Sequence, residues 1–226
     1  MQLWCMPRQP AFSPAEQAAI EKVLPEFPLR DICLFRLLNA TGLRISEGLK
    51  LTVRDTWTGT AIRADLVIAK RQLKGGRRQG SQVKSRVIPV SDTLRPVLAD
   101  LVFSIIGSGG EGADMNQPLF QGRGRRPLSR RQATHRLRQL LLAAGLSDRS
   151  GYGWHSARRT YAASIYAVTK FDLNLTRYVL GHAHLETTRI YLPEDDAAAR
   201  AATLAIGRAS APAEQPNHRA VGTVDF

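Results

Sequence analysis

Arg44, His155, Arg158, His182 and Tyr191 are the residues of this chain whose types and spacing best suit a chemical reaction. Arginines can neutralise the charge of a phosphodiester, imidazoles can move protons around it, and a phenol oxygen can attack it. The sequence offers neither a carboxylate pair nor a metal-ligand spacing beside them. Attack on a phosphodiester by a tyrosine side chain is therefore the chemistry that these residues predict.

The two arginines are the candidates for holding the phosphate. A guanidinium can bind a phosphate through two parallel hydrogen bonds and stays protonated, so it suits the charge that develops during attack. Arg158 stands three residues after His155. Residues i and i+3 share a face of a helix, so these two side chains can converge on one phosphate. Arg44 lies in Thr41-Gly-Leu-Arg-Ile-Ser-Glu47. For most other arginines a solvated surface position is the better interpretation.

Tyr191 is the candidate nucleophile. A phenol has an unperturbed pKa of about 10, so its proton must leave during attack or be drawn off by its surroundings. Tyr191 ends the segment Thr187-Thr-Arg-Ile-Tyr191, nine residues after His182. A packing role in the core is the better interpretation for the other tyrosines, which are Tyr152, Tyr161, Tyr166 and Tyr178.

Helical periodicity predicts the elements that position these residues. Ser13 and Glu16 form a capping box at the start of one helix, and Thr41-Gly42 ends the next. Arg44 therefore falls at the start of a short helix over residues 45–49. Further helices are predicted between Ser91 and Gly107, between Ser129 and Gly145, and near residues 156–168, 172–180 and 187–191.

Short β-strands are predicted between these helices. Residues 52–57, 66–70 and 86–90 are rich in β-branched and apolar side chains. The link from 72 to 85 is rich in glycine and basic residues, which is typical of a hairpin tip. The predicted fold is mainly α with a small antiparallel three-stranded β-sheet to one side.

The charge of the chain indicates a polyanionic partner. Its 32 Lys and Arg against 19 Asp and Glu leave a net charge of +13, which favours nucleic acid, although a ribosomal or merely basic protein shares this feature. Cys5 and Cys33 are too few for a disulfide framework, and no Cys/His spacing indicates zinc. The start lacks a secretory signal and no apolar run could span a bilayer, so we expect a cytoplasmic protein without a membrane partner.

In order and content, the motifs around Arg44, His155, Arg158, His182 and Tyr191 resemble the tyrosine recombinase, or phage integrase, family over roughly residues 13–196. The resemblance implies the catalytic-domain fold of that family and the chemistry of strand exchange. The tyrosine forms a 3′-phosphotyrosine link and releases a free 5′-hydroxyl, with neither ATP, metal nor other cofactor. By the same resemblance His155 manages the nucleophile's proton, and His182 hydrogen-bonds the phosphate.

The family supplies the proton for the leaving 5′-oxygen from a lysine on the hairpin between strands. Lys74 resembles that lysine, and Gly75-Gly76 can form the tight turn that aims it inward. The seven residues 78–84 then separate the turn from the next strand, where the family's turn runs straight into it. Lys84 therefore remains the alternative to Lys74.

The other basic residues near the hairpin and before the helix that Ser129 begins are expected to hold DNA without doing chemistry. Most contacts of this kind meet the phosphate backbone, for which a helix N-terminus is also suited. The predicted DNA-binding residues are Arg71, Arg77, Arg78, Lys84, Arg86, Arg123, Arg125, Arg126, Arg130 and Arg131.

The resemblance also implies partners and boundaries. Double-stranded DNA is the expected substrate, and strand exchange is expected in a homotetramer on DNA that forms from monomers in solution. The catalytic domain is expected over residues 13–196, after an N-terminal tail (1–12) and before a C-terminal helix and disordered tail (197–226).

Family members usually carry a separate helical DNA-binding domain before the catalytic one, and the 43 residues before Arg44 are too few for it. Two interpretations follow: a minimal recombinase that resembles the small fimbrial invertases, or a fragment of a longer protein. Two other functions also share these motifs or this fold. They are DNA relaxation of the type IB topoisomerase kind, and DNA binding by a protein that kept the fold and lost activity.

Overall fold

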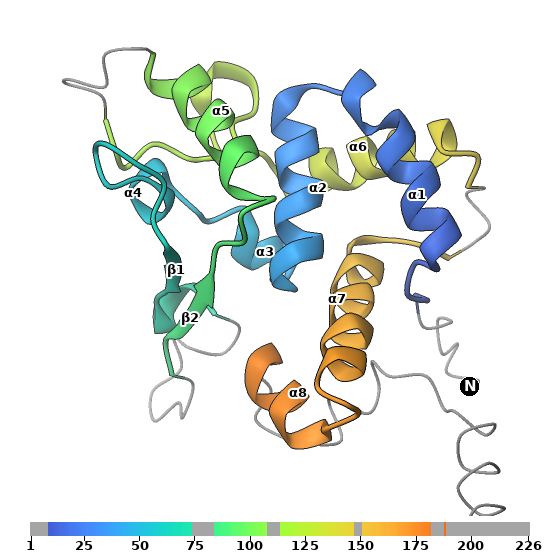
Figure 1. Ribbon diagram of the computed structural model, residues 1–226. Coiled ribbons are helices and arrows are strands. Elements are labelled where there is room, and N and C mark those ends of the chain that lie inside the picture. The colour runs from blue at the N-terminus through green and yellow to red at the C-terminus, as the bar shows by residue number, and fades with distance from the viewer. Residues whose placement is uncertain (1–8, 74–83, 108–113, 147–150, 182–187, 189–226) are drawn as a thin grey trace, which may run out of the picture. The chain divides into compact units, whose positions relative to one another are not determined.

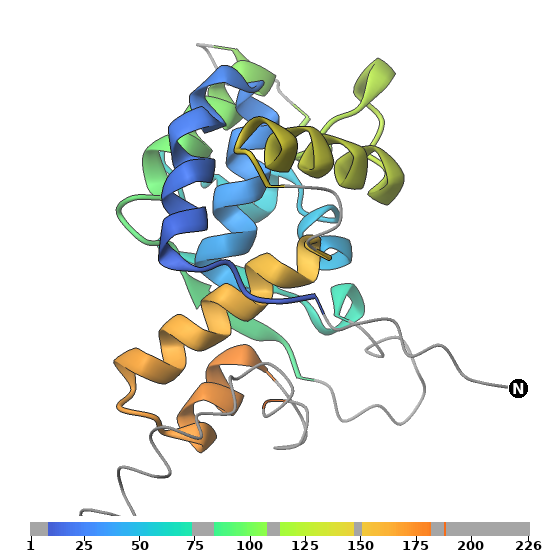
Figure 2. The same ribbon diagram turned by 90° about the vertical axis from the view of Figure 1, so that its right-hand side faces the viewer.

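A computed structural model describes residues 9–73, 84–107, 114–146, 151–181 and 188 of the chain (Figures 1 and 2). The chain divides into two units, residues 1–192 and 193–226, and every described residue lies in the first. The segments that carry Lys74, His182 and Tyr191 lie outside the described residues, as does the predicted C-terminal helix.

Most of the described residues are helical, as predicted. The α-helices are α1 (Pro14–Val23), α2 (Leu29–Thr41), α3 (Ile45–Gly48), α4 (Val53–Thr56), α5 (Arg95–Ile106), α6 (Arg130–Ala143), α7 (Trp154–Val168) and α8 (Leu173–Leu180). Short 3₁₀ turns are η1 (Leu24–Glu26), η2 (Lys70–Gln72) and η3 (Arg123–Arg125), and the strands are β1 (Asp65–Ile68) and β2 (Arg86–Pro89).

Local sequence signals set the ends of the first helices. The Glu16 N–H donates to Ser13 Oγ (3.3 Å) and the Ser13 N–H donates to Glu16 Oε2 (2.7 Å), so the predicted capping box is confirmed. Gly42 ends α2 in the left-handed conformation, with φ +60°. A Cβ at Gly42 would collide with the ring of Tyr161, so both the backbone and the space require glycine here.

The sheet has two strands among the described residues, not the three predicted. β1 and β2 pair antiparallel with Leu66 opposite Ile88 and Val67 opposite Val87. Leu66 and Ile88 are buried, whereas the two valines are exposed on the other face. The pair therefore shows the alternation expected of a sheet with one face on the core.

The strand predicted over residues 52–57 is wrong, because residues Val53–Thr56 form the helical turn α4. The Asp55 carboxylate accepts from the Thr52 N–H (2.8 Å) and from Thr52 Oγ1 (2.9 Å), which caps a helix start. Only Thr52 and Trp57, at its two ends, make isolated β-bridges. The β-branched residues of this segment suggested a strand, but a local side-chain cap decided its conformation.

Helix α2 forms the centre of the core and packs against α5, α6 and α7 (Figure 1). Cys33, Leu34, Leu37 and Leu38 recur at helical spacing and are all buried on it, so they form its apolar face. Because α2 is enclosed on several sides, its C-terminal end is held in a fixed place. That end leads directly to Arg44.

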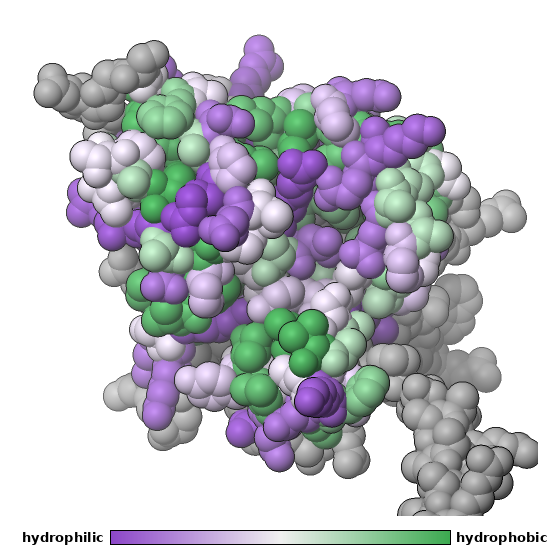
Figure 3. All heavy atoms as spheres, in the orientation of Figure 1, coloured by the Kyte–Doolittle hydropathy of each residue, from purple (hydrophilic) through white to green (hydrophobic). Residues whose placement is uncertain are grey.

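Helix α8 packs on α7 through one face only. Thr176 and Leu180 are buried, whereas Val168, Phe171 and Leu175 are exposed and contribute an apolar surface at this end of the described unit (Figure 3). The buried Leu180 fixes the end of α8, one residue before Gly181.

Residues 9–12, which the sequence analysis assigns to a tail, lie against α7. Phe12 is buried, and its N–H donates to Thr160 Oγ1 (2.8 Å). The Gln9 Oε1 accepts from the His155 N–H (3.0 Å), and a Cβ at Gly153 would collide with the Gln9 side chain. This segment therefore caps the start of the helix that carries His155 and Arg158. Among the described residues, no helix is long and apolar enough to cross a membrane.

Candidate active site

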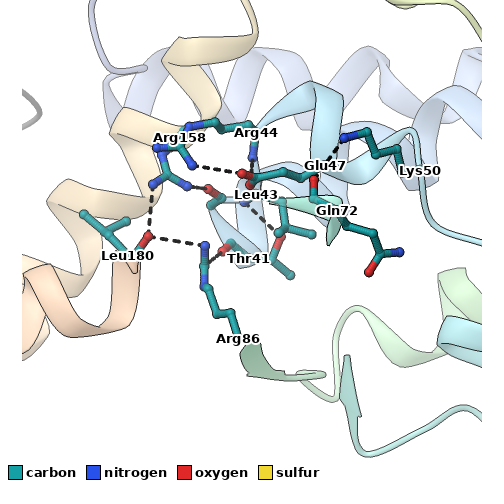
Figure 4. A network of polar contacts seen from close by, with 10 residues as sticks. Thr41, Leu43, Arg44, Glu47, Lys50, Gln72, Arg86, Arg158 and Leu180 are labelled. Carbon is teal, nitrogen blue, oxygen red and sulfur yellow. Dashed lines mark hydrogen bonds and ion pairs between the residues drawn. The ribbon is translucent and has the colours of Figure 1, made fainter. Parts of the chain in front are cut away.

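Arg44 is held at the start of α3 by a buried carboxylate. Its Nη1 contacts Glu47 Oε1 (2.9 Å), and its backbone N–H donates to Glu47 Oε2 (2.9 Å), as Figure 4 shows. Glu47 is only 1% exposed. Burial alone would raise the pKa of Glu47, but the charge and hydrogen bonds of Arg44, with the charge of Arg158, hold it below its ordinary value. Glu47 is therefore ionised at neutral pH and fixes the Arg44 side chain.

Arg158 is fully buried and joins the ends of two helices. Its Nη1 donates to the carbonyl of Gly42, at the end of α2, and its Nη2 donates to the carbonyl of Leu180 (3.0 Å), the last residue of α8. The last carbonyls of a helix lack intrahelical donors and carry partial negative charge, so a buried guanidinium is stable between them. Arg158 thereby lies between the segments that lead to Arg44 and to His182.

Arg86, the first residue of β2, points into the same place (Figure 4). Its Nη2 donates to the carbonyl of Thr41 (2.8 Å), and its Nη1 donates to the carbonyl of Leu180 (3.3 Å). The Leu180 carbonyl thus accepts from both Arg86 and Arg158. Arg86 was predicted to contact DNA, whereas its guanidinium is directed at main-chain carbonyls inside the protein.

His155 lies in the first turn of α7, in a strongly positive environment. Partial burial lowers its pKa, and the charges of Arg130, Arg158, Arg44 and Arg159 lower it further. The imidazole is therefore neutral at neutral pH and can accept a proton. Arg44 comes from a distant part of the sequence, and the structure brings it into one cluster with His155 and Arg158.

The remaining predicted catalytic residues lie outside the described residues. These are Lys74, His182 and Tyr191. Their flanking residues are described: Gly181, before His182, ends α8 with φ +65°, and Thr188, three residues before Tyr191, is buried. Gly181 lies against the Arg86 side chain, so the last described residue before His182 is next to that arginine.

The predicted DNA-binding residues fall into two groups. Arg123, Arg125 and Arg126 are exposed on a tight loop, which the Gln121–Pro127 bridge closes, and Arg130 and Arg131 are exposed where α6 begins. Ser129 caps that helix as predicted, since the Gln132 N–H donates to its Oγ (3.2 Å). Lys84 is exposed before β2. Arg77 and Arg78 lie outside the described residues, and Arg71 lies in η2 with only its backbone described.

Sequence reasoning missed two carboxylates that support these groups. Glu47 stands three residues after Arg44, a spacing typical of ion pairs on a helical turn, so charge pairing could have found it. Asp31 is a carboxylate on the otherwise apolar face of α2. It accepts from Arg136 on α6 (2.6 Å) and from Arg30 (2.8 Å), and Arg30 also donates to the Gln121 carbonyl (2.9 Å). Asp31 thus holds α6 through Arg136 and, through Arg30, the loop that carries the three exposed arginines after Gln121.

The comparisons with known proteins agree with this architecture. Residues 13–198 match the phage integrase family. One relative is the tyrosine recombinase XerC of Rhodospirillum centenum, which is 34% identical over 181 residues, 80% of this chain and 47% of the relative. The chain spans about half the length of the curated relatives it matches.

Solved structures establish the fold. The crystal structure of the XerA recombinase matches with a TM-score of 0.66 and 19% identity, over 91% of this chain and 65% of XerA. The XerH recombinase bound to its palindromic difH substrate, in a post-cleavage complex, matches with a TM-score of 0.64 and 20% identity, over 85% of this chain and 51% of XerH. The resemblance first seen in the motifs is thus confirmed: the chain belongs to the phage integrase family.

Proposed function

We propose that this chain carries the catalytic domain of a site-specific DNA recombinase. The observation that carries the proposal is the meeting of Arg44, Arg158 and His155 in one cluster, anchored by the ionised and buried Glu47. Two guanidiniums beside a neutral imidazole suit attack on a phosphodiester, because the guanidiniums stabilise the charge that develops and the imidazole can take the proton of the attacking hydroxyl.

In the proposed reaction the phenol oxygen of Tyr191 attacks the phosphorus of a DNA phosphodiester. The phenol proton passes to His155, and the bond from phosphorus to the 5′-oxygen breaks. Lys74 gives that oxygen its proton, which leaves a free 5′-hydroxyl and a 3′-phosphotyrosine. Arg44, Arg158 and His182 hold the nonbridging oxygens throughout. A 5′-hydroxyl, from the same or a partner duplex, then reverses these steps, so the energy of the broken bond is conserved and neither ATP nor metal is needed.

We infer a catalytic domain over residues 13–196, with residues 197–226 as its C-terminal extension. Exchange between two duplexes breaks four strands, and each break uses one tyrosine. Four copies of the chain on DNA therefore meet the chemical need. The exposed arginines 123, 125, 126, 130 and 131 are proposed to bind the phosphate backbone of that DNA.

Covalent capture tests the proposed function. The protein is incubated with sheared DNA of the organism that encodes it, in EDTA and without ATP, and complexes that survive denaturant are collected and sequenced. We expect protease-sensitive adducts enriched in one sequence, which then supplies nicked substrates for kinetics. Filter retention that denaturant abolishes completely would instead identify a DNA-binding protein. Adducts without sequence enrichment, together with relaxation of supercoiled DNA, would indicate a topoisomerase.

The choice between Lys74 and Lys84 as general acid has a direct chemical test. A substrate with a 5′-bridging sulfur has a leaving group that needs no proton, so it should restore cleavage selectively to a variant that lacks the general acid. We expect Lys74→Ala to cleave the sulfur substrate as fast as the unmodified protein does, and Lys84→Ala to behave alike on both substrates. Restoration of Lys84→Ala alone would give the role to Lys84.

Binding to DNA should depend steeply on salt. If the hairpin and the arginines of residues 123–131 together meet about six phosphates, the logarithm of the association constant should fall against the logarithm of salt concentration with a slope of about −5. Fluorescence anisotropy with a labelled duplex measures this slope. A slope near zero would contradict a DNA-binding role for these arginines.

A further inference from the structure

Among the described residues, Arg86 is the arginine whose guanidinium connects β2 to the ends of both α2 and α8. It opens β2, the strand that follows the segment carrying Lys74. Its two terminal nitrogens donate to the carbonyls of Thr41 and Leu180. Thr41 lies three residues before Arg44, and Leu180 lies two before His182. The end of α2 before Arg44, the end of α8 before His182, and the strand that follows the Lys74 segment therefore meet at one side chain.

The surroundings of Arg86 indicate a fixed position. Burial lowers its pKa, the charges of Glu47 and Tyr161 raise it, and Arg44 lowers it again, so its guanidinium lies within the electrostatic field of the site. Gly181 backs its stem: a Cβ there would lie 3.2 Å from Arg86 Cδ. The left-handed φ of +65° at Gly181 strains other residues as well. Glycine at position 181 therefore allows both the left-handed turn and the close approach of the Arg86 side chain.

We propose that Arg86 is a positioning residue that sets Arg44 and the segment leading to His182 relative to each other, through its hydrogen bonds to the Thr41 and Leu180 carbonyls. The inference rests on the proposed recombinase chemistry. Two carbonyls on different helix ends need a donor with two separated N–H groups, which guanidinium has and ammonium lacks. Loss of these two hydrogen bonds should shift the backbone that carries Arg44. A misplacement of about 1 Å in a catalytic group can cost on the order of 100-fold in rate.

Arg95 supplies a matched control. Like Arg86 it is half-buried, and it donates to main-chain carbonyls, those of Ile62 (3.1 Å), Arg63 (3.5 Å) and Val90 (3.3 Å). None of these carbonyls belongs to the helix ends before Arg44 and His182. Loss of Arg95 therefore reproduces the general cost of removing a half-buried arginine next to the sheet, without a direct effect on the site.

The test compares Arg86→Gln, Arg86→Lys and Arg95→Gln in single-turnover cleavage of the captured DNA site, at a temperature where thermal melts show all three to be folded. We expect Arg86→Gln to cleave on the order of 100-fold more slowly than Arg95→Gln. Arg86→Lys should stay at least about tenfold slow, because a single ammonium cannot replace the two-pronged donor. For DNA binding by Arg86→Gln, the slope of the logarithm of the association constant against the logarithm of salt concentration should equal that of the unmodified protein.

A substrate with a neutral methylphosphonate at the cleaved position separates positioning from general loosening. Its reacting phosphorus group carries less charge for Arg44 to neutralise, so the rate ratio of Arg95→Gln to Arg86→Gln should shrink. An equal ratio on both substrates would overturn the inference, as would equal rates of the two variants. A salt slope smaller by about one in Arg86→Gln would show a phosphate contact instead, and overturn it too. If the unmodified protein forms no adduct, the proposed function fails first and this inference with it.

Discussion

Replacing Arg158 by alanine is expected to abolish DNA cleavage and to lower the free energy of unfolding by about 3 kcal/mol. The side chain is fully buried, and its loss removes the donors to the Gly42 and Leu180 carbonyls. It also removes one of the charges that keep Glu47 ionised. Urea-induced unfolding measures the stability, and single-turnover cleavage measures the rate. A variant as stable as the unmodified protein would show that these hydrogen bonds contribute little.

Arg158→Lys keeps the catalytic part of this prediction testable if the alanine variant does not fold. Lysine keeps the positive charge but cannot bond both helix ends and the phosphate together. Cleavage should still fall by on the order of 100- to 1000-fold, the cost of losing one fixed donor to a developing negative charge. Arg95→Ala is the control, which should lose stability without losing the rate of cleavage by folded protein. Normal cleavage by Arg158→Lys would contradict the role proposed for the guanidinium.

Tyr191→Phe is expected to remove covalent attachment to DNA completely while leaving DNA affinity nearly unchanged. The substitution deletes the attacking oxygen and no positive charge, so the electrostatic part of binding stays intact. Denaturing gels detect the adduct, and anisotropy measures the affinity. Tyr178→Phe is the matched control, because Tyr178 is 79% exposed on α8. Adduct formation by Tyr191→Phe would assign the attack to another residue.

The helical part of the fold could be predicted because its signals are local. Two capping boxes supply the hydrogen bonds that the first turns of their helices need, one from Ser13 and Glu16 and the other from Ser129 and Gln132. Neither box depends on a distant contact. The apolar face of α2 follows from period alone, since Cys33, Leu34, Leu37 and Leu38 recur at helical spacing. Both kinds of signal are complete within a few residues of the chain.

The roles of Arg86 and Asp31 could not be predicted, because their partners are distant in sequence. Arg86 resembles any basic residue beside a hairpin until the Thr41 and Leu180 carbonyls are seen at its guanidinium. The net charge of +13 favoured a DNA contact, although a buried arginine can equally satisfy helix ends. The structural role of Asp31 likewise depends on Arg136, which lies 105 residues away in the sequence.

The candidate site was predictable to a different degree for each residue. His155 and Arg158 share one turn of α7, so their spacing already placed them together. The lowered pKa of His155 was not visible in the sequence, since it depends first on burial and then on charges such as those of Arg130 and Arg44, which belong to other elements. The strand predicted over residues 52–57 failed for the opposite reason: the Thr52–Asp55 cap is local, but strand propensity outweighed it in the prediction.

The most direct test of the account is the identity of the bond between protein and DNA. The unmodified protein is trapped on a nicked form of its captured site, digested with trypsin and nuclease, and the modified peptide is sequenced by mass spectrometry. We expect a single nucleotide adduct on Tyr191, with a blocked 3′ end and a free 5′-hydroxyl on the cut strand. An adduct on another residue, a 5′-linked protein, or cleavage without any covalent link would contradict it.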